Sequence, residues 1–213
     1  MAVLPQLEIK RRLRLDVTHR ESLVISPEPV SECFDLDSVD MRLGSLFLLP
    51  RVPATPFYCP GSGGAEFHMR VHVPLGEYLV VPAHQTVLGS TLEFIRLPYD
   101  VSGQILTKSS IGRTFTVIET ASWVHPQYRG CLTLEIANGS NTPILLYPGR
   151  RIAQLILFEV ASPEDSDAPI SSTYFGPVFP EPPKFKALRE ELAEIGVYDI
   201  REPPKAPTER TPA

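Results

Sequence analysis

Short apolar segments separated by proline, glycine and asparagine dominate the middle of the chain, from Asp35 to about residue 160. Eight of these segments have the length and apolar content typical of β-strands, with turn residues between them. They are Ser45–Leu49, Glu77–Val81, Thr91–Leu97, Gly103–Leu106, Phe115–Ile118, Cys131–Ile136, Ile144–Tyr147 and Ile152–Val160. Because no helices alternate with them and no internal repeat appears, the pattern predicts an all-β barrel or sandwich.

Helical spacing occurs only near the two ends of the chain. Four apolar residues recur among basic ones between Gln6 and Leu15, and they predict a short N-terminal helix. A second stripe predicts a C-terminal helix, because prolines stand just before it and Gly196 follows it. The apolar members are Leu7, Ile9, Leu13 and Leu15 in the first helix, and Phe185, Leu188, Leu192 and Ile195 in the second.

These patterns divide the chain into three parts. Residues 1–30 form a helical or extended N-terminal segment, and residues 31–160 form the β-domain. Residues 161–213 comprise a proline-rich connector, the short helix and a tail whose composition predicts disorder from residue 202 onward.

Composition and charge narrow the functional classes. The net charge of −5 argues against a broad nucleic-acid-binding face, so any phosphate-binding site has to be local. The three cysteines contain no CxxC pair, and therefore indicate neither a disulfide framework nor a thiolate zinc site. No apolar stretch has the length of a signal peptide or a membrane span. We therefore expect a soluble cytoplasmic protein without a membrane partner.

The segment Lys108–Arg113, which reads KSSIGR, is a candidate phosphate-binding turn. Two cations, two hydroxyl groups and a glycine within six residues can supply ion pairs, hydroxyl donors and exposed backbone amides to a phosphate chain. Such a turn at the end of a strand is more commonly only solvated, so this motif alone decides nothing.

A carboxylate interrupts the apolar strand Cys131–Ile136. Strand alternation places Leu132, Leu134 and Ile136 on one face and Glu135 on the other, together with Cys131 and Thr133. A lone glutamate in this position either faces solvent or lies in a cleft, and the strand by itself leaves both open.

The order of the motifs gives these residues their meaning, because together they resemble the dCTP deaminase family of the dCTP deaminase and dUTPase superfamily. The likeness covers roughly residues 35–160. Its blocks are Ser38–Gly44 (SVDMRLG), Leu97-Pro98, Lys108–Arg113, Thr120-Ala121, Val124-His125-Pro126, Leu134-Glu135, Thr142-Pro143-Ile144, Pro148-Gly149 and Ile152–Leu155 (IAQL).

This resemblance implies a distorted β-barrel, dUTPase-like and related to the jelly roll, that assembles as a homotrimer with active sites between subunits. The implied reaction is the deamination of dCTP to dUTP and ammonia without zinc. The zinc-deaminase signature His-x-Glu followed by Pro-Cys-x-x-Cys is missing from the chain. Mg²⁺ would arrive bound to the substrate triphosphate, with no metal site in the protein.

The resemblance also assigns roles to individual residues. Glu135 matches the catalytic carboxylate that moves a proton from water to the leaving ammonia. Ser109 matches a serine at the reacting centre, and Arg113 and Lys108 match cations near the triphosphate. The further implied substrate contacts are Ser110, Ile111, Gly112, Ala121, His125, Thr133, Leu134, Gln154, Tyr174 and Lys184.

Two departures keep alternatives open. His125 stands where the family has an aspartate that contacts the sugar 3′-hydroxyl and that dUTPases need for hydrolysis. A neutral imidazole can still accept a hydrogen bond, but it cannot supply a fixed carboxylate. Lys186-Ala187-Leu188 also replaces the glutamine-glycine part of the family's C-terminal lid. Two alternative functions stay open: a dUTP diphosphatase, which His125 disfavours, and a catalytically silent nucleotide-binding paralogue acting as a sensor or interaction module, which the altered lid favours.

Overall fold

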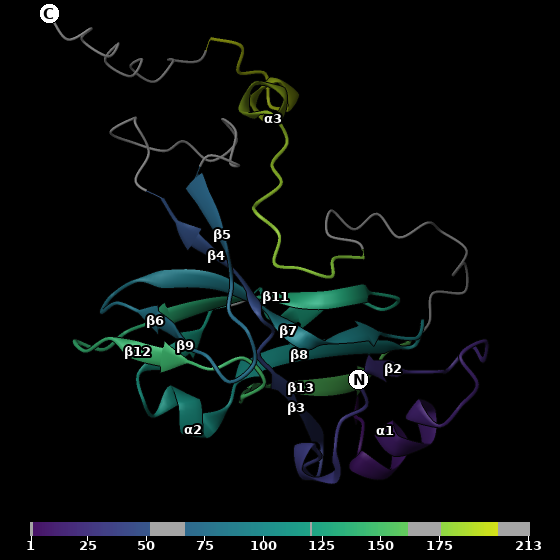
Figure 1. Ribbon diagram of the computed structural model, residues 1–213. Helices are drawn as coiled ribbons and strands as arrows, with labels where there is room; N and C mark the ends of the chain where they lie inside the picture. The colour runs from purple at the N-terminus through teal and green to yellow at the C-terminus, as the bar shows by residue number, and fades with distance from the viewer. Residues whose placement is uncertain (1, 52–66, 120, 162–175, 200–213) are drawn as a thin grey trace, which may run out of the picture. The chain divides into compact units, whose positions relative to one another are not determined.

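The computed structural model describes residues 2–51, 67–119, 121–161 and 176–199. The chain forms two compact units, Met1–Leu48 with Arg70–Glu181, and Leu49–Met69 with Pro182–Ala213. In the described residues the first unit is dominated by antiparallel strands, which confirms the all-β prediction (Figure 1). The boundaries expected near residues 30 and 160 stay a prediction.

The elements follow the sequence pattern closely. In chain order they are β1 (Ala2–Val3), α1 (Gln6–Leu13), β2 (Val24–Ser26), the 3₁₀ turn η1 (Ser31–Cys33), β3 (Ser38–Arg42), β4 (Leu46–Pro50), β5 (His68–His72), β6 (Leu79–Val81), β7 (Thr86–Arg96), β8 (Val101–Thr107), α2 (Ser109–Gly112), β9 (Thr116–Ile118), β10 (Trp123–Val124), β11 (Arg129–Asn138), β12 (Ile144–Leu146), β13 (Arg151–Glu159) and α3 (Leu188–Glu194).

Two antiparallel sheets carry the core. One has the order β1-β13-β8-β10 with β3 also paired to β13, and the other has the order β5-β4-β7-β11-β9 with β2 also paired to β7. Strands β6 and β12 form a separate two-stranded sheet. Both large sheets contribute side chains with no more than 2 % exposure, among them Phe47, Ile95, Ile105, Leu134, Ile136, Leu155 and Leu157.

Each of the eight expected strands has a counterpart in the structure, with shifted ends. The strand expected at Thr91–Leu97 begins earlier, at Thr86, and the one expected at Phe115–Ile118 begins at Thr116. Phe115 has a φ of 59°, so its backbone is left-handed and cannot continue a strand. The sequence pattern missed β1, β2, β3, β5 and β10.

The N-terminal helix is confirmed, but its apolar stripe is not the buried face. Ile9 is fully buried, whereas Leu7 is 81 % exposed. The second buried residue of the helix is Arg12, whose guanidinium forms a two-point ion pair with Asp100 at 2.9 and 2.8 Å. Arg12 therefore anchors α1 through its ion pair with the buried Asp100.

The second unit contains the C-terminal helix, which is shorter than the pattern predicts. It begins at Leu188, so Phe185 lies before it rather than on its stripe. No residue of α3 is buried. Most of the connector and the tail from residue 202 lie outside the described residues. Among the described residues, no helix is long and apolar enough to cross a membrane.

Candidate active site

Glu135 projects from the exposed face of β11. Its neighbours in the strand, Leu134 and Ile136, are completely buried, and Glu135 itself is exposed. The predicted alternation is thereby confirmed around the carboxylate. It breaks down nearer the start of the strand, where the register shifts between Cys131 and Thr133 and Cys131 is buried.

A second carboxylate, Glu119, lies opposite Glu135. Strand β9 pairs with β11 so that Ile118 faces Ile136, and the next residue, Glu119, donates its backbone N–H to the Glu135 carbonyl over 2.8 Å. Partial desolvation of its carboxyl group by the surrounding protein raises the pKa of Glu135, and the charge of Glu119 raises it further. A carboxyl group that takes up a proton more readily than usual is suited to general acid–base work.

The KSSIGR motif lies where β8 ends. The Lys108 N–H donates to the carbonyl of Ile152 at 3.0 Å, and the four residues that follow form the helical turn α2. This turn leads directly into β9, whose Ile118 N–H donates to Thr107 Oγ1 at 2.8 Å. The motif therefore connects β8 of one sheet to β9 of the other, and Glu119 directly follows β9 in the same unit.

Lys108 differs from the expected picture of a cation held ready for phosphate. Its Nζ lies 2.8 and 2.6 Å from the two carboxylate oxygens of Asp40, which is buried in β3. Arg151 lies 3.4 Å from the same carboxylate. The first task of Lys108 is thus to neutralise a buried charge, and its role toward the triphosphate stays a prediction.

Arg113, the other cation of the motif, is placed differently. It is exposed at the C-terminal end of α2, and its side chain makes no hydrogen bond or ion pair with the residues the structure describes. Ser109 and Ser110 are also exposed on this turn, while Ile111 and Gly112 are half-buried. Arg113 is therefore the cation of this motif that can meet a phosphate without breaking an existing pair.

A cavity of about 230 Å³ borders the motif at Ile111. Apolar side chains from β9, β12 and β13 line it together with Ile111. The lining residues with polar groups are Thr114, Thr116, Tyr147 and Arg150, and Thr114 Oγ1 lies 3.1 Å from Thr116 Oγ1. Ile111 is thus the residue of the motif that borders this mainly apolar cavity.

Gln154 lies in the same row of side chains as Asp40. It pairs with Asp40 on β3 and with Leu106 on β8, and it is half-buried. The structure therefore brings Gln154 close to Lys108 through Asp40. Ala121 and His125 are exposed on either side of β10.

The other residues predicted to contact the substrate lie in different environments. Leu134 is fully buried between the sheets, so only its backbone could meet a substrate. Thr133 accepts a hydrogen bond from the Glu181 N–H at 3.2 Å. Tyr174 lies outside the described residues, and Lys184 is exposed in the second unit. The described residues contain no cluster of three histidine, cysteine, aspartate or glutamate side chains able to hold a metal.

Sequence reasoning missed Glu119 and Asp40. Glu119 acquires its place only through the β9–β11 register, which no local pattern reveals. Asp40 stands in the SVDMRLG block, and the resemblance of that block was a signal that could have identified it.

Comparisons with known proteins place these residues in a family. A family model described as dCTP deaminase-like matches residues 3–160. A "dCTP deaminase, dUMP-forming" of Corynebacterium diphtheriae is 37 % identical over 151 residues, covering 68 % of this chain and 80 % of the relative. A protein of the same name from Methanobrevibacter smithii is 33 % identical over 168 residues, covering 78 % and 84 %.

A solved structure supports the fold. The 2′-deoxycytidine 5′-triphosphate deaminase of Agrobacterium tumefaciens superposes with a TM-score of 0.56 at 24 % identity. The match covers 73 % of this chain and 48 % of that one, so this chain spans about half of its length. The expected dUTPase-like β-fold is confirmed, whereas the names of the sequence relatives give dUMP rather than dUTP as their product. On the match of residues 3–160 and the identity to these relatives, the chain belongs to the dCTP deaminase-like family, which confirms the expectation of a hydrolase of the dCTP deaminase type.

Proposed function

We propose that this chain removes the amino group of dCTP by hydrolysis, without zinc, and that Glu135 moves the proton. The observation that carries the proposal is the Glu119–Glu135 pair, in which partial desolvation of the carboxyl group and a neighbouring charge raise the pKa of Glu135. Glu135 can accept a proton from water and return it within one turnover.

The reaction requires Glu135, one water molecule and the cytosine ring. Glu135 takes one proton from a water molecule while the water oxygen bonds to C4 of the cytosine ring. Glu135 then gives that proton to the amino nitrogen, the C4–N bond breaks, and ammonia leaves. The second proton of the water ends on N3 of the resulting uracil ring, and Glu135 returns to its starting state.

Binding of the triphosphate is assigned to the α2 turn. Arg113 presents a guanidinium fork, and Ser109 and Ser110 present hydroxyl groups, all from the exposed side of the turn. The substrate enters with Mg²⁺ held by its own phosphate oxygens. The assembly as a homotrimer and the cytoplasmic location belong to the same proposal.

We take dUTP as the product because of His125. An imidazole at this position supplies no fixed carboxylate to prepare a water molecule for attack on the phosphate chain. The specific observation that favours a second candidate, release of dUMP, is the name shared by relatives that are 33–37 % identical.

One incubation separates these possibilities. Purified protein is mixed with dCTP and Mg²⁺, ammonia is measured enzymatically, and the phosphorus products are resolved by ³¹P NMR. Ammonia with dUTP supports the proposal, whereas ammonia with dUMP and pyrophosphate establishes the second candidate. Tight dCTP binding without any turnover would contradict both and indicate a nucleotide sensor.

A further inference from the structure

Glu119 is a second carboxylate on the face of the sheet that carries Glu135. In the antiparallel register of β9 and β11, Ile118 lies opposite Ile136, and both of these side chains are buried. The next pair along the strands, Glu119 and Glu135, therefore projects to the other face, where both residues are exposed. Directly opposed residues of an antiparallel pair have their Cβ atoms about 5 Å apart, so the two carboxyl groups are neighbours.

Neither carboxyl group has a partner that neutralises it. Within the part of the chain that the structure describes, the side chains of Glu119 and Glu135 form no ion pair and accept no hydrogen bond. Like charges placed directly opposite each other destabilise a sheet, and proteins tolerate such conflicts mainly at functional sites. A pair that lacks both a cation and a hydrogen-bond donor is suited to a ligand that brings the donor.

Glu119 also leads directly into a segment that we expect to contact the substrate. Ala121, one of the expected contacts, follows two residues later and is exposed as well. In the proposed reaction Glu135 acts at C4 of the cytosine ring. The neighbouring carboxylate of Glu119 is then placed to meet the group that is bonded to this carbon.

The group bonded to C4 distinguishes the substrate from its product. Cytosine carries an amino group there, which donates hydrogen bonds, whereas uracil and thymine carry an oxygen, which only accepts them. A carboxylate likewise accepts hydrogen bonds and donates none. Glu119 can therefore bind the amino group of cytosine, whereas it opposes the C4 oxygen of uracil with a second acceptor and no proton to share.

We propose that Glu119 is the residue that selects cytosine, by accepting a hydrogen bond from one N–H of the 4-amino group while Glu135 acts on C4. This inference rests on the proposed deamination, because that reaction places C4 beside Glu135. It gives a recognition role to a residue for which the proton transfer itself requires no step.

The same contact helps the product to leave. When the amino group departs as ammonia and an oxygen takes its place, the hydrogen bond to Glu119 is replaced by a contact between two acceptors. A mismatch of this kind at the edge of a base costs about ten- to a hundredfold in affinity. Glu119 therefore favours the substrate over the product at the same site.

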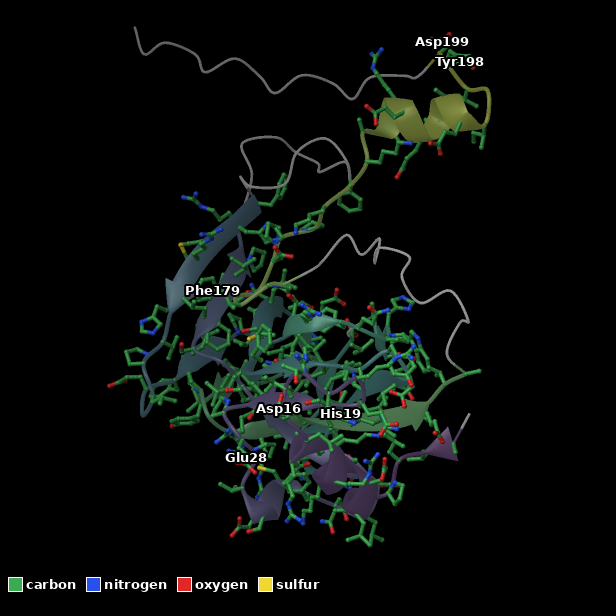
Figure 2. All side chains as sticks on the ribbon, turned by 90° about the vertical axis from the view of Figure 1, so that its right-hand side faces the viewer. Asp16, His19, Glu28, Phe179, Tyr198 and Asp199 are labelled. Atoms are coloured by element: carbon green, nitrogen blue, oxygen red, sulfur yellow. The ribbon has the colours of Figure 1, made fainter. Side chains whose placement is uncertain are left out.

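The test is isothermal titration of the full chain with dCTP and with dUTP, in a Glu135→Ala background and at a fixed Mg²⁺ concentration. Alanine prevents turnover and, unlike glutamine, offers no side-chain donor to Glu119. In this background Glu119→Gln is compared with Glu28→Gln as a matched control. Glu28 is an exposed glutamate of the N-terminal segment, toward the bottom of Figure 2.

A third ligand, the triphosphate of the pyrimidin-2-one deoxynucleoside, separates recognition from folding. Its ring carries only hydrogen at C4, so it neither donates a hydrogen bond to Glu119 nor opposes it with an acceptor. A variant that has lost structure binds all three nucleotides more weakly. A variant that has lost only the recognition of the amino group keeps its affinity for this analogue.

We expect Glu119→Gln to lower the ratio of dCTP affinity to dUTP affinity by about tenfold or more, because a glutamine amide can turn and donate a hydrogen bond to the C4 oxygen. Affinity for the pyrimidin-2-one analogue should stay unchanged, and Glu28→Gln should alter none of the three. An unchanged ratio, an equal loss for all three ligands, or no binding of dCTP would overturn the proposal.

Ammonia release by the unmodified chain is measured separately, so that the two proposals fail in different ways. A preference for dCTP that disappears in Glu119→Gln, without ammonia release by the unmodified chain, contradicts the deaminase activity and supports the selection of cytosine by Glu119. Ammonia release together with an unchanged affinity ratio in Glu119→Gln contradicts the role of Glu119 and supports the deaminase.

Discussion

Glu119 donates its backbone N–H to the carbonyl of Glu135, and this hydrogen bond of 2.8 Å sets two carboxylates opposite each other at the edge of β11. The pairing matters because the charge of one glutamate resists ionisation of the other. Burial is the larger cause of the raised pKa of Glu135, and Glu119 is the second.

Replacing Glu119 should therefore shift the pH profile. In Glu119→Gln the pKa of Glu135 falls back toward its usual range, so the acidic limb of the kcat profile should move to lower pH. The shift is measured from ammonia release between pH 4 and 8, with Glu77→Gln as a control because Glu77 is exposed in a loop. Unchanged profiles in both variants would mean that Glu119 has no influence on the reacting carboxyl.

The two cations of the KSSIGR motif should respond oppositely to substitution. Lys108→Met leaves the buried Asp40 without its main partner and should lower the free energy of unfolding by about 2–4 kcal/mol. Arg113→Met should change stability by no more than about 0.5 kcal/mol, since Arg113 has no partner among the described residues. Urea denaturation measures both.

The Arg113 variant also distinguishes an effect on nucleotide binding from an effect on folding. Arg113→Met should weaken dCTP binding by about 1.5–3 kcal/mol and deoxycytidine binding hardly at all. Equal weakening for nucleotide and nucleoside would show that Arg113 supports the fold rather than the triphosphate. Calorimetry with the two ligands makes the distinction.

His125 should limit how firmly the sugar is held. A carboxylate at this position accepts a charge-assisted hydrogen bond from the 3′-hydroxyl, which is about twice as strong as a neutral one. We therefore expect His125→Asp to tighten dCTP binding several-fold, measured by calorimetry in a Glu135→Gln background that prevents turnover. No gain, or the same gain with 2′,3′-dideoxy-CTP, would place His125 away from the sugar.

The glycine at position 130 should allow residues 176–181 to pack closely against β11. Its φ is +142°, and a Cβ atom there would lie 2.5 Å from Pro177 Cδ. The Pro177 carbonyl accepts the Cys131 N–H at 2.6 Å, so Gly130→Ala should detach residues 176–181 from the strand. Faster hydrogen exchange at Cys131 and Glu181, with protection retained at Leu134, would record this. Unchanged exchange at all three amides would contradict it.

The sequence pattern predicted strands best where one face is wholly apolar, as in β11 and β13. It missed β3 because Asp40 and Arg42 interrupt the alternation and resemble loop residues. Both are held in the strand by partners far along the chain, since Asp40 pairs with Lys108 and Arg42 lies 2.5 Å from the buried Glu93. No local signal contains those pairings.

The candidate site also combines residues that the sequence could identify with residues that it could not. Glu135 could be identified because adjacent residues reveal its strand and because the ordered motifs of residues 35–160 carry the resemblance. Glu119 could not, since only the register of β9 against β11 brings it opposite. The burial of Leu134 likewise follows from packing between sheets rather than from its motif.

The most direct test of the proposed chemistry is ammonia release from dCTP by the unmodified chain and by Glu135→Gln. Glutamine keeps the shape of the side chain and removes the basic oxygen, so turnover should fall by about two to four orders of magnitude. The folded state should not suffer. Folding raises the pKa of Glu135, so ionisation of this side chain at neutral pH lowers the free energy of unfolding. Glutamine stays neutral, and the variant should therefore melt no lower than the unmodified protein at pH 8. Any difference in melting temperature should disappear at pH values below the usual pKa of glutamate, where both side chains are neutral. Ammonia release abolished in a variant that still binds dCTP and melts normally is the result we predict. Near-normal release from Glu135→Gln would contradict the assignment of the proton-transfer role to this residue.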